Sequence, residues 1–97
     1  GDDPEIFRLL LEIYEKETPA KLLNLEKLVL AGDLDQAMKT AHSLKSGSLS
    51  LGVYYFSELL EQIERRLKDG QTEQVKDMLP GLNGAYEAAC AELHRFA

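Results

Sequence analysis

A histidine and a lysine stand three residues apart in the middle of the chain, at His42 and Lys45, with small residues close behind them. An imidazole whose pKa is near 6.5 is largely neutral at pH 7, and its free nitrogen is then a good nucleophile. An ammonium group one helical turn away can place positive charge beside an incoming phosphoryl group. Because phosphoryl transfer depends on positioning and charge stabilisation, this pair is a candidate acceptor site for a phosphoryl group.

The helical position of His42 turns its imidazole toward solvent. The core side of the same helix is expected to consist of Leu34, Ala37, Ala41, Leu44 and Ser48. At about 100° per residue, His42 lies about 120° from the centre of that side, and Lys45 lies on the shoulder between the two. Ser46 follows His42 by four residues, so we expect an exposed imidazole beside an ammonium group and a very small side chain.

Four small residues, Ser46, Gly47, Ser48 and Ser50, follow the histidine although all are poor helix formers. Glycine alone costs a helix interior about 1 kcal/mol relative to alanine. Two explanations stay open: close helix packing at Gly47 and Ser48, or a surface around His42 that must remain accessible to a bulky partner.

Other kinds of catalytic site lack their motifs. The glycines are scattered at helix ends, so no phosphate-binding loop is formed, and His42 and His94 are too far apart for a metal-ligand pair. The single Cys90 can form neither an internal disulfide nor a zinc site by itself and is expected in the core. A serine–histidine hydrolase is compatible with the composition, but a nucleophile elbow is missing and a small bundle leaves little room for substrate. We therefore expect no enzyme activity of its own, no metal ligands and no cofactor.

Composition places the chain among ordinary globular domains. It has 97 residues, 44% hydrophobic and 29% charged, which predicts one domain over residues 1–97. With 11 basic and 17 acidic residues the net charge is -6, which argues against nucleic-acid and anionic-membrane partners. No apolar run is long enough for a membrane span or a signal peptide, and the lone thiol suits a cytoplasmic location. The start at Gly1 instead of Met suggests a fragment of a longer signalling protein.

Helical periodicity dominates, and alternating strand patterns are missing. Asp3-Pro4 and Thr18-Pro19 both resemble helix starts, so a first helix is expected over about 4–16 and a second from Thr18 to Gly32. The packed face of the first helix is expected to hold Ile6, Leu9, Leu10 and Ile13.

Three further helices follow at short intervals. The third is capped by Asp33 and closes at Gly52, the fourth starts at Val53, and the fifth starts at Thr72 with a kink or short break near Pro80. Because the connections are short, neighbouring helices should run antiparallel. The expected fold class is all-α, an antiparallel helical bundle with a four-helix core plus an N-terminal capping helix.

This pattern resembles the histidine-containing phosphotransfer (HPt) domain of bacterial multistep phosphorelays. The resemblance covers roughly residues 5–95 and includes the turn Ala31-Gly32-Asp33 before the histidine helix. Its motif comprises Ala41, His42, Leu44, Lys45, Ser46, Gly52, Phe56, Leu59, Ile63 and Glu64. Where the family most often has Gly, Ala and Asn, this chain has Ser46, Leu49 and Ser50, and Pro80 is unusual in the last helix.

The resemblance implies that His42 is the phosphorylated histidine and that Lys45 holds the phosphoryl group. Its implied partners are receiver domains of response regulators or hybrid sensor kinases, which would supply Mg²⁺ and most of the catalysis. The chain would carry the phosphoryl group between two receivers as a monomer, in the cytoplasm or as the cytoplasmic part of a membrane-bound sensor kinase.

The receiver-contacting residues are expected to be Lys39, Ser43, Ser46, Leu49 and Tyr54. Of Tyr54 and Tyr55, one is expected to pack inward and the other to border this surface. Glu61 and Glu64 are expected on a solvated face, and His94 in a last helical turn where the helix dipole favours it.

Two other functions remain open from the sequence. One is a docking module that binds receiver-like domains without phosphotransfer. The other is a helical-bundle fragment of an unrelated signalling protein. Acid-labile phosphate on His42 would separate both from a phosphoryl carrier.

Overall fold

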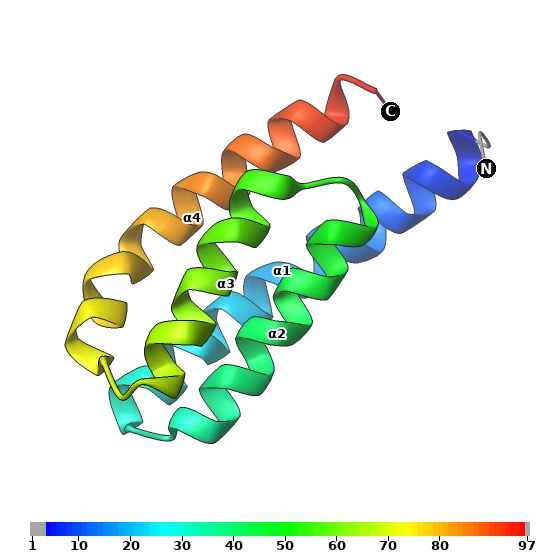
Figure 1. Cartoon of the computed structure of the whole chain (residues 1–97). Helices are drawn as coiled ribbons and strands as arrows, with labels where there is room; N and C mark the ends of the chain where they lie inside the picture. Colours follow the sequence, from blue (N-terminus) through cyan, green and yellow to red (C-terminus); the bar gives the residue numbers. More distant parts are fainter. Residues whose placement is uncertain (1–3, 97) are drawn as a thin grey trace.

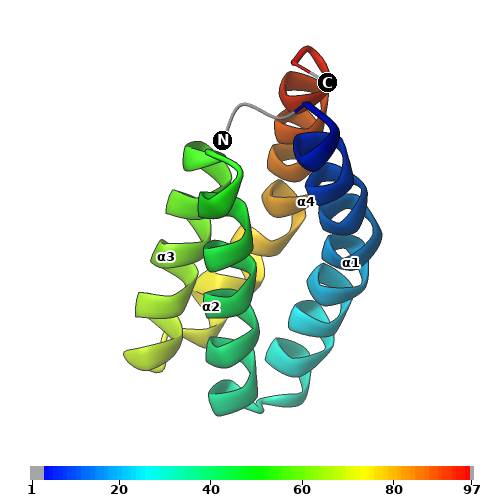
Figure 2. The same ribbon diagram turned by 90° about the vertical axis from the view of Figure 1, so that its right-hand side faces the viewer.

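The computed structural model describes residues 4–96, which form four helices and no strand. They are α1 (Pro4–Ala31), α2 (Leu34–Ser50), α3 (Tyr54–Lys68) and α4 (Thr72–His94). Consecutive helices run in opposite directions (Figure 1). Each helix packs on the next one, and α4 also packs on α1, so the four helices enclose one core (Figure 2). The expected all-α antiparallel bundle is confirmed.

Every helix contributes apolar side chains to the core at helical spacing. Buried residues on α1 include Leu22, Leu25 and Val29, and those on α4 include Val75 and Leu82. The middle helices bury Ala37, Ala41, Leu44, Phe56, Leu60, Ile63 and Leu67. Burying a large apolar side chain contributes about 1.5–3 kcal/mol, so these contacts fix the rotation of each helix about its axis. That rotation decides which side chains of α2 face solvent.

The N-terminal segment is not a separate capping helix, because α1 runs without interruption through Pro19. The side chains that pack inward there are Leu11, Tyr14 and Thr18, and they continue the buried side formed by Leu22 and the residues after it. The lost hydrogen bond at Pro19 is thus offset by packing on both sides of it. The side expected to be packed is instead exposed, with 44–57% of Ile6, Leu9, Leu10 and Ile13 accessible to solvent. The expected cap at Asp3 lies outside the described residues.

Short turns set where α2 begins and ends. Gly32 has a φ of 77° and Gly52 has a φ of 76°, a conformation that glycine adopts without strain. The side chain of Asp33 accepts a hydrogen bond from the backbone N–H of Gln36 at 3.3 Å, so the expected N-cap is confirmed. These turns give α2 a fixed length and place His42 near its middle.

The last helix is continuous through Pro80, so the expected short break does not occur. Cys90 is half-buried against the core, as its neighbours in the sequence suggest. His94, in the last turn of α4, also contacts α1, because its Nε2 lies 2.6 Å from Oε1 of Glu15.

Among the described residues, no helix is both long and apolar enough to cross a membrane.

Candidate functional site

The exposed side of α2 carries His42, whose side chain is 61% accessible to solvent. The opposite side of the helix is anchored by the buried residues Ala41 and Leu44 on either side of it in the sequence. Lys45 lies on the shoulder of the helix, and its side chain is only 20% exposed. Both orientations agree with the helical spacing, because the core side of α2 is the one that the sequence predicts.

Two of the small residues in α2 have different roles. The hydroxyl of Ser48 is fully buried and lies 2.7 Å from that of Tyr14, so it joins α2 to α1. Gly47 does not serve close packing, because a Cβ added there would meet no atom within 4 Å. The packing explanation therefore holds for Ser48. It does not hold for Gly47, where the surface of α2 is open.

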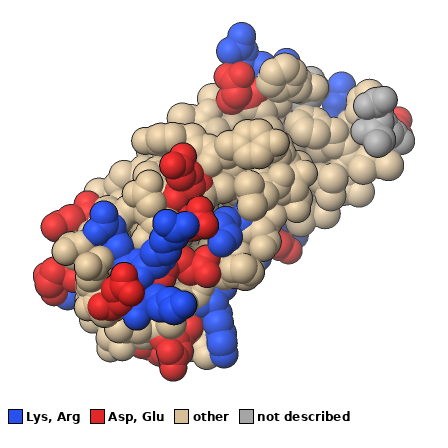
Figure 3. Space-filling model, viewed as in Figure 1, with Lys and Arg blue, Asp and Glu red and all other residues tan. Residues whose placement is uncertain are grey.

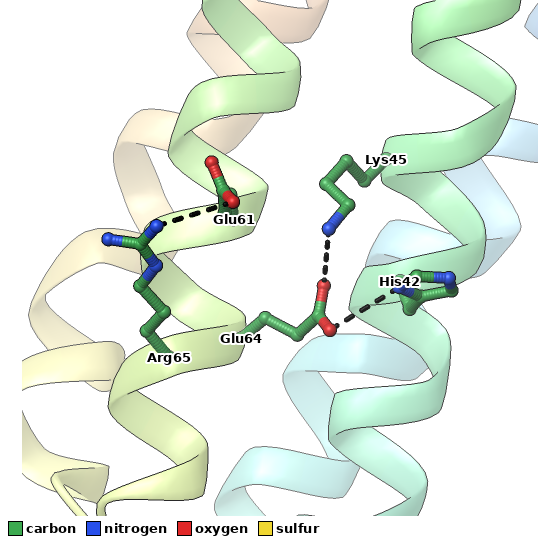
Figure 4. Close-up of polar contacts among 5 residues, drawn as sticks. All are labelled: His42, Lys45, Glu61, Glu64 and Arg65. Carbon is green, nitrogen blue, oxygen red and sulfur yellow. Dashed lines mark hydrogen bonds and ion pairs between the residues drawn. The ribbon is translucent and has the colours of Figure 1, made fainter.

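Glu64 of α3 connects the two residues of the candidate site (Figure 4). Its Oε2 lies 3.3 Å from Nδ1 of His42, and its Oε1 lies 3.1 Å from Nζ of Lys45. The Glu64 side chain is 27% exposed, and Oε1 is buried. Glu64 is thus not part of a solvated face, and the expectation that it would be was wrong. Glu61, one turn earlier, is more exposed and pairs with Arg65 at 3.5 Å.

The contact between His42 and Glu64 selects one form of the neutral imidazole. An ionised carboxylate only accepts hydrogen bonds, so Nδ1 carries the proton when it binds Glu64. The lone pair of the neutral ring then lies on Nε2, which points away from Glu64 (Figure 4). In this form the exposed His42 side chain carries its lone pair on the nitrogen that does not contact Glu64, and the contact with Glu64 orients the ring.

The expected partner-binding residues are all exposed. Leu49 and Tyr54 line a shallow groove between α2 and α3 together with Lys45. Ser43 lies on the other flank of α2, where its hydroxyl accepts a hydrogen bond from Nζ of Lys21 at 3.2 Å. Lys39 precedes His42 by one helical turn, and Ser46 follows it by one turn. 

Both tyrosines at the start of α3 face solvent. Tyr54 is 73% exposed and Tyr55 is 69% exposed, so the expectation that one of them packs inward was wrong. The inward positions of this turn are occupied by Val53 and Phe56 instead. The two phenol rings therefore enlarge the accessible surface at the end of the bundle where α2 ends and α3 begins.

Sequence reasoning did not assign a role to Glu64 or Lys21. Glu64 belongs to the motif that carries the family resemblance, but the motif does not place it beside His42 and Lys45; its position next to the buried Ile63 places it at the edge of the α2–α3 contact. Lys21 lies between the buried residues Thr18 and Leu22 of α1, which places it at the edge of the contact between α1 and α2.

In the described part of the chain, no group of three or more His, Cys, Asp or Glu side chains could hold a metal ion.

Comparison with known proteins gives one match. No curated protein and no solved structure matches the chain. The family model of the Hpt domain matches residues 9–95, a span that contains His42, Lys45 and Glu64. The four-helix bundle is the fold expected of such domains. The chain therefore belongs to the Hpt domain family, whose members are phosphotransfer modules of phosphorelays.

Proposed function

We propose that Nε2 of His42 accepts a phosphoryl group from the aspartyl phosphate of a receiver domain and passes it to the aspartate of another receiver. In the first step the N–P bond forms as the acyl P–O bond breaks, and the receiver recovers its carboxylate. In the second step a receiver carboxylate forms the new P–O bond and the imidazole leaves. The receivers supply the divalent metal ion in both steps.

The observation that carries this proposal is the contact of His42 with Glu64. Nδ1 of His42 lies 3.3 Å from Oε2 of Glu64, while 61% of the His42 side chain is accessible to solvent. The proton thus has a fixed place on Nδ1 throughout the transfer, and Nε2 is free to form or release the N–P bond. The carboxylate also stabilises the positive charge that the ring gains as the N–P bond forms, as an orienting acid does for other catalytic histidines.

Lys45 is the residue that we expect to contact the phosphoryl oxygens. In the unphosphorylated chain its ammonium group rests against Glu64 at 3.1 Å, one helical turn from His42. A phosphoryl group on Nε2 offers several anionic oxygens, and a flexible lysine side chain can turn toward them. Glu64 thus keeps the ammonium group close to the reacting nitrogen before the phosphoryl group arrives.

The surface beyond His42 suits a protein partner. Between Lys45 and Glu58 the chain has no charged residue, and its exposed positions include Ser46, Leu49 and Tyr54. Figure 3 shows most charged side chains of this face gathered toward one end, and a largely uncharged surface over the rest of it with a few charged side chains at the far rim. We propose that the receiver covers this uncharged surface together with Lys39 and Ser43.

The test is transfer from a phosphorylated receiver with Mg²⁺. The wild-type chain gains one phosphate that is stable in base and labile in acid, and His42→Gln gains none. His94→Gln is the matched control and keeps full labelling. Since surface substitutions usually change stability by about 0.5 kcal/mol or less, His42→Gln should keep its helical circular-dichroism spectrum. Undiminished labelling of His42→Gln contradicts the proposal, and receiver binding without any labelling of the wild-type chain would indicate a docking module instead.

A further inference from the structure

Lys21 reaches from α1 to the residue that follows the candidate phosphoacceptor. Its Nζ donates a hydrogen bond to Oγ of Ser43 at 3.2 Å. Both residues line a groove between α1 and α2. In the bundle, α1 and α3 lie on different sides of α2 (Figure 2). The site around His42 is thus bordered by an ammonium group on each flank, Lys45 toward α3 and Lys21 toward α1.

The two ammonium groups differ in how far they are neutralised. Lys45 lies 3.1 Å from a carboxylate oxygen of Glu64 and shares that charge with it. Lys21 contacts a neutral hydroxyl, and no carboxylate of residues 4–96 lies within ion-pair distance of it. Glu17 lines the same groove one turn earlier on α1 without pairing with it. Lys21 therefore keeps its positive charge available to a partner, and it gives up only one hydrogen bond to a hydroxyl when it moves.

The partner of the proposed reaction is negatively charged where it must approach. An aspartyl phosphate is anionic, and the carboxylates that hold a divalent metal ion beside it add to that charge. The chain itself has a net charge of -6, so its overall field repels such a surface. A lysine at the edge of the contact offsets this repulsion locally and can pair with a carboxylate of the receiver.

Resting on the proposed function, we propose that Lys21 is a partner-binding residue that pairs with an acidic group of the receiver at the α1 edge of the docking surface. Ser43 holds its ammonium group in place until the receiver arrives. Lys45 acts on the transfer step, because it shares the Glu64 carboxylate with His42. Lys21 acts on the affinity for the receiver, because it contacts Ser43 at the edge of the docking surface and has no contact with His42 or Glu64.

The experiment compares Lys21→Met, Lys21→Arg and the control Lys27→Met, which removes an exposed lysine on another side of α1. The donors are phosphoramidate and the phosphorylated receiver that labels the wild-type chain fastest. Lys21→Met should raise KM for the receiver about 5-fold, the size of one exposed ion pair, and leave kcat unchanged. The dependence of kcat/KM on ionic strength should become shallower, since one attractive charge is lost. Lys21→Arg and Lys27→Met should behave as the wild type, as should labelling of all variants by phosphoramidate.

Two kinds of result would overturn this assignment. An unchanged KM in Lys21→Met shows that the receiver does not use Lys21. A lower kcat, or slower labelling by phosphoramidate, shows that Lys21 acts on the phosphoryl group or on the fold instead. If neither donor labels the wild-type chain, the proposed function itself fails; a labelled wild type with an unaltered Lys21→Met overturns the role of Lys21 alone.

Discussion

At the scale of single residues, Glu64 gives His42 and Lys45 a common partner. One carboxylate oxygen faces the imidazole at 3.3 Å and the other faces the ammonium group at 3.1 Å. Because Oε1 is buried, it is less hydrated than a surface carboxylate, and its attraction to Lys45 is correspondingly less screened. The arrangement joins α2 to α3 at the point where the phosphoryl group is expected to bind.

Lys45→Ala should slow phosphotransfer by about 10-fold to 100-fold, the size of one lost charge-assisted contact of about 1.5–3 kcal/mol. Receiver affinity should change much less, because the Lys45 side chain is mostly covered by the chain itself. Single-turnover transfer rates and receiver binding by titration calorimetry measure the two effects. Lys76→Ala removes a lysine that pairs with Glu73 on α4, and it should transfer at the wild-type rate. Equal rates for Lys45→Ala and the wild type would show that Lys45 has no part in the transfer.

The sequence predicts one half of this site and not the other. His42 and Lys45 lie on one helix, so their separation and exposure follow from helical geometry alone. Glu64 lies on a different helix, and its contact depends on the distance and rotation between α2 and α3. Those quantities result from the packing of many side chains, among them Phe56, Leu60 and Ile63, and local spacing does not contain them.

At the scale of helices, α1 shows how packing overrides a local signal. Thr18 and Pro19 have the residue types of a helix start, yet Thr18 is buried and the helix continues through both. A continuous inward side from Leu11 through Tyr14 and Thr18 to Leu22 is visible in the sequence. In the sequence, a more apolar side of the same helix contains Ile6 and Ile13 and is an equally plausible candidate for burial. Only the packing of the whole bundle determines which of the two sides faces the core.

Pro19→Ala should raise the free energy of unfolding by about 2 kcal/mol. The new N–H can bond to the carbonyl of Glu15, and the exposed pyrrolidine ring contributes little packing. Part of the gain is lost because alanine makes the unfolded chain more flexible than proline does. Urea unfolding followed by circular dichroism measures the change. Pro4→Ala is the control and should have little effect, since the first helical residue needs no N–H partner. A Pro19→Ala variant no more stable than Pro4→Ala would contradict this account of α1.

At the scale of the whole molecule, three ionisable side chains link α1 and α4 near the core. The ring of Tyr86 on α4 lies 5.8 Å from those of Tyr14 and Phe56. Burial raises the pKa of Tyr86 and Tyr14 above the ordinary value of 10.0. Burial also raises the pKa of the Cys90 thiol above its ordinary value of 9.0, although its hydrogen bond with Tyr86 acts in the opposite direction. The fold therefore favours the protonated, neutral form of all three groups.

Stability should accordingly decrease in alkaline solution. Below pH 9 all three groups are protonated in both the folded and the unfolded chain, and their contribution is fully present. As the pH rises past 9.0 and 10.0, the unfolded chain loses these protons first, so the free energy of unfolding falls until the raised pKa values of the folded state are passed. Urea unfolding between pH 7 and 11 measures this slope. Tyr86→Phe should have a shallower slope than the wild type, and the exposed control Tyr54→Phe should keep the wild-type slope; equal slopes for the two variants would contradict the prediction.

An even number of antiparallel helices brings the start of α1 and the end of α4 to the same end of the bundle (Figure 1). The bundle is 42 Å long, and His42 follows the first residue of α2 by eight positions, about 12 Å from the opposite end at 1.5 Å per residue. A receiver domain fused to either terminus would start about 30 Å from His42, a distance that about nine extended residues span. Fusions at the two termini are thus nearly equivalent, and the length of the tether, more than the choice of terminus, would set the effective concentration of a fused receiver at the imidazole.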